Sequence, residues 1–249
     1  MAKRDASYDS RWTDAAAHVS SAGNEAVEVV QIIARSQVSD RIRLRHYTKG
    51  SQIYVRGDQV EAVFFLLSGK VRIYSIGNNG RRVTHWFVSG GEFFGLADQW
   101  NRSYVHDVCA ESQQNVVALV IPHKGLNDLM DSSPLVRDSI LRQLARRVRT
   151  NRNLIVSSTT EQLSVRLFQL LVSLEETKRF GSQEKRAVVG YTQEDLAELL
   201  GVTRQSVNRV LRLLEDSGLI KVNRLFISVI GSAGHGFNVL GTDYPPLTI

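Results

Sequence analysis

The stretch YTQEDLAELLGVTRQSVNRVLRLLEDSGLI, residues 191–220, has the apolar spacing of two short helices that cross at a tight turn. Its predicted shared core consists of Leu196, Leu200, Val207 and Val210. Ala197 is small, which lets the second helix pass directly over the first. Gly201 stands where the turn needs a left-handed backbone, a conformation that glycine enters at little cost. The stretch therefore predicts a helix-turn-helix.

The second helix of this pair is expected to run from about Thr203 to Glu215, with Thr203 as its cap and Thr192 as the cap of the first helix. The outward residues near its start are polar or basic: Arg204, Gln205, Asn208, Arg209 and Arg212. Arginine can donate two hydrogen bonds to guanine, and glutamine or asparagine can pair similarly with adenine. Four of these residues are therefore predicted base contacts: Arg204, Gln205, Asn208 and Arg209.

Phosphate contacts are predicted around the same helix. Two short strands, residues 219–222 and 225–230, flank Asn223 and Arg224 and would form a wing beside it. The predicted phosphate contacts are Thr192, Thr203, Arg212, Lys221 and Arg224. A net charge of +6 and a pI near 9.6 suit a polyanionic partner, so double-stranded DNA is the expected one.

The sequence texture changes upstream, between residues 41 and 121. Short β-forming runs such as AVFFLLSG and KVRIYSI alternate with glycine and asparagine turns, which predicts a barrel or sandwich. We place a strand-rich domain, a β-roll, at residues 24–123, including a short helix at 24–36. Residues 1–23 are expected to form a flexible arm or a loosely docked helix, and residues 232–249 a tail with no assigned role.

A long amphipathic helix is predicted at residues 124–157. Its apolar stripe includes the residues Val136, Ile140, Leu144, Val148 and Ile155, and its flanks are rich in arginine. The stripe suits a two-stranded coiled coil in a homodimer, and packing on the chain's own barrel is the alternative. We expect residues 157–160 to be a hinge or a helix cap at the start of a DNA-binding domain, residues 158–231. In it, a second helix at 161–178 and a polar loop, RFGSQEKRA, precede the helix-turn-helix.

Several protein classes are disfavoured by what the sequence lacks. No apolar run approaches the roughly 20 residues that a membrane span needs, and the N-terminus has no signal-peptide stretch, so a cytoplasmic location without membrane contact is expected. Cys109 is the sole cysteine and cannot by itself hold an iron–sulfur cluster. An enzyme built on a metal-binding β-barrel is the main rival interpretation. The chain has no clustered histidines, nucleophile elbow or phosphate loop, so we expect no catalysis and no metal.

The order of strand-rich domain, long helix and winged helix-turn-helix resembles the cAMP receptor protein and FNR (Crp/Fnr) superfamily of bacterial transcription regulators. Three stretches support the resemblance: LLSGKVRIYSIGNNGRRVTHWFVSGGEFFG, LARRVRTN and LAELLGVTRQSVNRVLRLLEDSGLI. It implies an α+β fold with an N-terminal β-roll that serves as a sensory domain, a long dimerisation helix and a C-terminal winged helix-turn-helix. It also implies a homodimer on an inverted-repeat operator, with RNA polymerase as a further candidate partner.

The resemblance implies that Arg204, Gln205 and Arg209 contact base edges. Gln205 departs from the family, which usually has a glutamate there, so the operator should differ from the usual one at that base pair. In the stretch FFGLADQWNRSYVHDVCA, Leu96 replaces the glutamate that holds a ribose in nucleotide-binding members. The pair Arg102-Ser103 comes about two residues early for the cyclic phosphate. These departures disfavour cAMP as the effector.

A small-molecule effector of unassigned identity is nevertheless expected, because the architecture joins a pocket-sized roll to a DNA-binding head. The candidate pocket residues are Phe94, Leu96, Arg102, Ser103, Tyr104, Asn151 and Arg152. Asn151 either fixes helix register or touches the effector. Haem through His106 and Cys109 is not expected, since lone histidines on strands are mostly surface or satisfied residues. The alternatives are a constitutive DNA binder with a vestigial sensory domain and a cyclic-nucleotide regulator with a divergent pocket.

Overall fold

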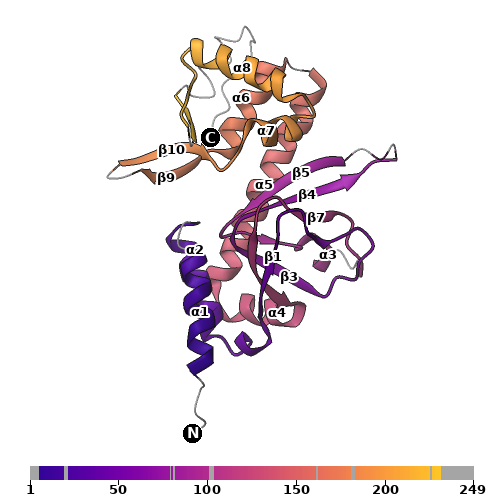
Figure 1. Ribbon diagram of the computed structural model, residues 1–249, viewed down its shortest axis with the longest axis vertical. Helices are drawn as coiled ribbons and strands as arrows, with labels where there is room; N and C mark the ends of the chain where they lie inside the picture. The colour runs from indigo at the N-terminus through magenta and orange to yellow at the C-terminus, as the bar shows by residue number, and fades with distance from the viewer. Residues whose placement is uncertain are drawn as a thin grey trace. The chain divides into compact units, whose positions relative to one another are not determined.

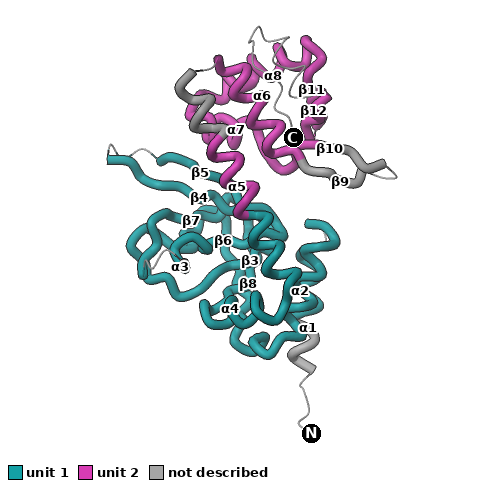
Figure 2. The backbone as a smooth tube through the Cα atoms, turned by 180° about the vertical axis from the view of Figure 1, so that it is seen from behind, with its two compact units in different colours: residues 1–143 teal, residues 144–249 magenta. Residues whose placement is uncertain are grey.

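The computed structural model describes residues 6–230, apart from 20, 21, 79, 81, 101–103, 161, 181, 182 and 225 (Figure 1). The chain divides into two compact units, Met1–Gln143 and Leu144–Ile249 (Figure 2). Each unit has a buried apolar core of its own. Among the described helices, none has the length and apolar character needed to cross a membrane.

The first unit is built around two four-stranded antiparallel sheets. One sheet has the order β1 (Arg43–Tyr47), β8 (Val116–Pro122), β3 (Ala62–Ser68), β6 (Phe93–Phe94). The other has the order β2 (Gln52–Tyr54), β7 (Cys109–Ser112), β4 (Lys70–Ile76), β5 (Arg82–Ser89). Apolar side chains of both sheets form one buried cluster, including Phe64, Ala118, Ile73 and Ala110. The predicted β-roll is thereby confirmed.

Helices α1 (Ala6–Val19) and α2 (Asn24–Arg35) precede the sheets, and a 3-10 turn, η2 (Ser39–Arg41), leads into β1. Trp12, Ala15 and Val19 on α1 are buried. The prediction of a flexible arm is thus wrong for residues 6–19. There the structure shows the other possibility, a helix docked within the first unit. A Cβ on Gly91, whose φ is +88°, would lie 2.8 Å from the Ala26 side chain, so α2 packs closely on the turn after β5.

The single long helix predicted for residues 124–157 is two helices. Helix α4 (His123–Ser132) ends before Ser133, and α5 (Pro134–Thr160) begins at the proline. Ser133 is extended, with φ −131° and ψ 105°, because the residue before a proline is sterically biased away from helix. Residues 157–160 lie inside α5 rather than forming a hinge. The remaining helix of this unit is the short α3 (Ala97–Trp100).

The second unit contains α6 (Leu163–Leu174), α7 (Gln193–Leu200) and α8 (Arg204–Asp216). Its sheet has the order β11 (Ile220–Val222), β12 (Phe226–Val229), β10 (Gln183–Val189), β9 (Glu176–Phe180). The two predicted wing strands are confirmed as β11 and β12. The predicted helix at 161–178 ends earlier, and the polar loop predicted after it is largely a β-hairpin in which Glu176 pairs with Ala187. Leu167, Leu171, Leu196 and Leu214 share one buried core.

Candidate nucleic-acid interface

The start of α7 and the turn after it are fixed by local hydrogen bonds. The Thr192 hydroxyl oxygen accepts from the Asp195 N–H at 3.1 Å, and the Thr192 N–H donates to the Asp195 carboxylate at 2.6 Å. This capping box satisfies donors that the first turn of a helix leaves open. Gly201 ends α7 with φ 66°, in the left-handed region, and the Val202 N–H donates to the Ala197 carbonyl at 3.0 Å. The predicted cap Thr192 and the predicted turn glycine Gly201 are therefore both present.

The orientation of α8 is set by its cap and by its buried face. The Thr203 hydroxyl accepts from the Ser206 N–H at 3.2 Å. Four apolar side chains of α8 are buried in the core of the unit: Val207, Val210, Leu211 and Leu214. Because these positions recur every three or four residues, the opposite face of α8 must point to solvent.

The solvent face of α8 carries the predicted base-contacting residues. Arg204, Gln205 and Arg209 are exposed, and Asn208 is half-buried. Arg212 follows on the same exposed side. Within the part of the chain that the structure describes, no hydrogen bond or ion pair engages these five side chains. We call these five residues the reading edge. Its donors are therefore available to an external partner.

The wing lies next to the C-terminal end of α8 in sequence and is tied to it. The Glu215 carboxylate accepts from the Val222 N–H at 2.8 Å. Lys221 and Arg224, the two predicted phosphate contacts of the wing, are exposed. Glu215 was named from the sequence only as the end of the second helix, and this hydrogen bond was missed, because the bond depends on how β11 folds back onto α8. Arg166 was also missed: its guanidinium donates to the Leu200 carbonyl at 2.7 Å and so joins α6 to the end of α7.

The candidate effector residues do not gather in one described cavity. Phe94 and Leu96 are 0% and 2% exposed and belong to the core of the roll, whereas Tyr104 is 87% exposed. Arg102 and Ser103 lie outside the described residues. Asn151 and Arg152 are on α5 within the second unit, where Asn151 is half-buried and Arg152 exposed.

A buried aromatic stack that the sequence analysis missed fills this part of the roll. Tyr54 stacks on His106 with ring centroids 3.8 Å apart, and Phe64 stacks on Phe94 at 4.8 Å. The His106 Nδ1 lies 2.8 Å from the Asp98 carboxylate, so this histidine has a structural partner. Cys109 is buried, and its sulfur accepts from a backbone N–H. No group of three or more potential metal ligands occurs among the described residues.

A second polar network was missed on the other sheet. The Glu111 carboxylate is 2.7 Å from the Arg82 guanidinium and 3.1 Å from that of Arg72. Gln52 and Gln113 each donate a further hydrogen bond to it at 3.0 Å. Burial alone raises the pKa of Glu111, but these cations and donors together outweigh burial and hold its pKa below the ordinary value. The network lies on the face of β4 and β7 that is opposite the buried cluster of Ile73 and Ala110, and it reaches Arg82 on β5.

The predicted dimer residues fall into two groups. Val136 and Ile140 are fully buried within the first unit. Their assignment to a dimer contact is therefore wrong, and they follow the alternative prediction, in which the helix packs on the chain's own roll. Leu144 is half-buried, Val148 is 69% exposed, and the side chain of Ile155 lies outside the described set. Leu141, which was missed, is 54% exposed seven residues before Val148. The exposed apolar face of α5 therefore begins at Leu141.

Two family models match the chain. The cyclic nucleotide-binding domain matches residues 44–133, and the Crp-like helix-turn-helix domain matches residues 165–230. Electron transport regulator A of Shewanella oneidensis is 26% identical over 208 residues, which are 82% of this chain and 81% of that protein. The cAMP-activated global transcriptional regulator CRP of Haemophilus influenzae is 20% identical, covering 84% of this chain and 99% of that protein. The structure of FixK2 from Bradyrhizobium japonicum shares the fold, with a TM-score of 0.61 and 19% identity; the match covers 80% of this chain and 96% of that one.

Proposed function

Since this chain belongs to the Crp/Fnr superfamily of DNA-binding transcription regulators, we propose that it binds an inverted-repeat operator as a homodimer. In this proposal α8 enters the major groove, and Arg204, Gln205, Asn208 and Arg209 contact base edges. The single observation that carries it is the reading edge, a row of unengaged donors opposite a fully buried face.

The chemistry of the reading edge favours DNA over other anions. Two arginines and two carboxamides can match the paired donors and acceptors of guanine and adenine in the major groove. Phosphate contacts from Thr192, Thr203, Arg212, Lys221 and Arg224 would fix the register of α8 on the duplex. Gln205 offers both a donor and an acceptor, so it would favour adenine at the base pair that the glutamate expected from the family resemblance would contact.

A second copy of the chain is proposed to pack along α5. Leu141 and Val148 are exposed and one heptad apart, which is the spacing of a coiled-coil seam. Asn151 lies three residues after Val148 and would fix the register of that seam. Two-fold symmetry would place two copies of α8 about 34 Å apart in successive major grooves, so the operator should be an inverted repeat.

The test is selection of binding sites from a random duplex library with the full-length protein, followed by mobility-shift measurements on the selected sequence. An inverted repeat bound by two chains is the expected result. Recovery of single half-sites bound by one chain would refute the dimeric operator. Loss of all sequence preference would refute base contact by α8.

We further propose that a small-molecule effector controls this binding, with a constitutive DNA binder as the second candidate. The aromatic stack of Tyr54, His106, Phe64 and Phe94 favours the second candidate, because it occupies roll interior that a ligand would otherwise enter. The two candidates are separated by measuring affinity for the selected operator before and after adding a pool of cell metabolites. A ligand-gated regulator changes its affinity, and a constitutive one does not.

A further inference from the structure

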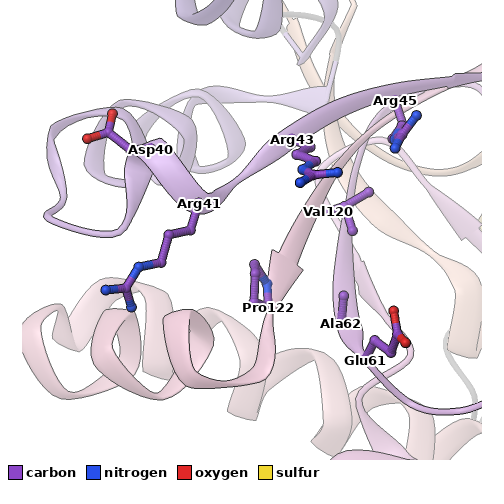
Figure 3. A pocket seen from close by; sticks show the side chains of 8 residues that line it. All are labelled: Asp40, Arg41, Arg43, Arg45, Glu61, Ala62, Val120 and Pro122. Carbon is purple, nitrogen blue, oxygen red and sulfur yellow. The ribbon is translucent and has the colours of Figure 1, made fainter.

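A groove of about 580 Å³ opens on the first unit beside β1, and the reading edge and the candidate effector residues do not contribute to it (Figure 3). Its floor is apolar and is formed by Ala62, Val120 and Pro122. Arg43 pairs with Val120 in the sheet, so both side chains lie on the same face. Val120 also packs against the buried core of the roll. The groove is therefore the open continuation of the inner face of the roll at the edge strand.

Three guanidinium groups line this groove, those of Arg41, Arg43 and Arg45, and all three residues are exposed. Among the residues that the structure places, none forms a hydrogen bond or an ion pair with these three guanidinium groups. Arg43 and Arg45 are two positions apart on one strand, roughly 7 Å along the chain, and share a face. Like charges held this close repel one another, so an anion bound between them would be stabilised.

Two carboxylates, Asp40 and Glu61, also line the groove. Figure 3 shows Asp40 and Arg41 pointing in different directions, with Glu61 at the far side of the apolar floor. A DNA backbone or a uniformly acidic protein surface would bring negative charge against both carboxylates. A small anion can instead place its acidic groups on the arginines and turn hydroxyl or amino donors toward Asp40 and Glu61.

We propose that the groove is a ligand site for a small organic anion that carries at least two carboxylate or phosphate groups. Each guanidinium can form paired hydrogen bonds with one such group, and the spacing of Arg43 and Arg45 favours two groups over one. The volume lies within the roughly 300–1,000 Å³ of small-molecule sites. The site does not depend on the proposed DNA binding, and its ligand is the chain's second anionic partner.

The test uses the full-length protein with citrate and inorganic diphosphate as separate probes, in isothermal titration calorimetry at low salt. The two probes distinguish carboxylate from phosphate preference. At least one is expected to bind with a dissociation constant of about 1 mM or tighter. Arg43→Ala and Arg45→Ala should each weaken that binding about tenfold, because each removes a charge-assisted pair of hydrogen bonds. Arg43→Lys keeps the positive charge but cannot form the paired hydrogen bonds of a guanidinium, so it should weaken binding less than Arg43→Ala does.

Arg56→Ala is the matched control, since Arg56 is exposed on the same unit but does not line the groove. It should bind the probe as the parent does, and the melting temperatures of all variants should match the parent. Absence of saturable binding by both probes would overturn the proposal. So would binding that Arg43→Ala and Arg45→Ala leave unchanged. A hexaglutamate peptide that binds more tightly than either probe would overturn it in favour of an acidic protein partner.

Discussion

Arg209 and Lys221 are both exposed cations of the second unit, but they lie on different elements and are expected to make different contacts with DNA. Arg209 follows the buried Val207 and precedes the buried Val210, so it projects from the middle of the reading edge. Lys221 lies on β11 opposite Ser228, at the side of the wing. In the proposed function, Arg209 on α8 would contact a base edge and Lys221 on the wing would contact phosphate.

Replacing Arg209 by Ala should therefore weaken binding to the selected operator by about 1 to 3 kcal/mol and relax preference at one guanine. Lys221→Ala is the comparison, because it should weaken every sequence alike and reduce the salt dependence of binding by about one phosphate contact. Fluorescence anisotropy on the operator and on single-base variants measures both effects. Equal loss on all sequences for Arg209→Ala would contradict base contact.

Glu111 gives a pH-dependent contribution to stability at the same scale. Its pKa in the folded chain lies below the ordinary 4.5, so the carboxylate stabilises the fold above that pH. This stabilisation is lost as the pH falls below 4.5 and through the lower pKa of the folded state. Glu111→Gln should therefore be less stable than the parent at about pH 7, with a gap that narrows toward about pH 3.

Thermal unfolding between those pH values measures the gap for Glu111. Glu28→Gln on α2 is the control, because Glu28 is exposed and lies outside the network. Its unfolding curve should run parallel to that of the parent. A gap for Glu111→Gln that stays constant down to about pH 3 would show that the carboxylate charge is not what stabilises the network.

At the scale of elements, the Gln143 side chain joins α5 to β6. Gln143 is 3% exposed; its amide oxygen accepts from the Phe93 N–H at 2.9 Å, and its amide nitrogen donates to the Phe93 carbonyl at 2.5 Å. A two-residue strand has few hydrogen bonds of its own, so this pair of bonds holds β6 against the helix. The next residue, Phe94, belongs to the buried aromatic stack.

Gln143→Ala should lower the free energy of unfolding by about 2 to 3 kcal/mol, because it removes two buried hydrogen bonds to the Phe93 backbone. Gln143→Glu keeps an acceptor for the Phe93 N–H but loses the donor to the Phe93 carbonyl. Its loss of stability should therefore come mainly from the missing hydrogen bond to that carbonyl and from the burial of a charge. Urea unfolding monitored by tryptophan fluorescence measures both. Full stability of Gln143→Ala would mean that water or a neighbour replaces the amide.

Elements whose signals lie within a few residues of sequence were predictable, whereas individual contacts between residues far apart in the sequence were not. The caps Thr192 and Thr203 and the turn glycine Gly201 act within three or four residues, so α7 and α8 follow from the sequence. Pro134 alone predicts a break at Ser133, but Leu129 lies seven residues before Val136, so the same apolar face continues across the proline and favours one long helix. Gln143 bonds to a residue 50 positions away, and no local pattern indicates such a pair.

The β9–β10 hairpin and the effector residues illustrate the same limit. Residues 176–187 are mostly polar or charged without regular alternation, so the sequence carries little strand signal there; β9 and the first part of β10 form strands by pairing with each other, from Glu176–Ala187 to Phe180–Gln183. Phe94 and Leu96 were candidate pocket residues because of their place in a motif. Whether such a residue faces a cavity or the core depends on contacts far away in the sequence: Phe94 stacks on Tyr54 of β2, and Tyr54 in turn stacks on His106 in the loop before β7.

At the scale of the whole molecule, the exposed apolar residues of α5 are the proposed seam between two copies. Val148→Glu should weaken self-association at least about tenfold, because a charge would be buried in a coiled-coil seam. Sedimentation velocity over a concentration series measures this. Val83→Glu is the matched control, since Val83 is 54% exposed on the roll and outside the proposed seam. Equal sedimentation of both variants would place the dimer contact elsewhere.

The single, buried Cys109 has a practical consequence for such studies. Its thiol is shielded within the roll, with 3% of the residue exposed, so a maleimide or methanethiosulfonate reagent should react far faster with a cysteine introduced on the surface. A spin label or fluorophore can thus be attached at one chosen position without removing the native residue. A label on the second unit outside the reading edge would report the distance between the two copies of the proposed dimer in solution, with and without operator.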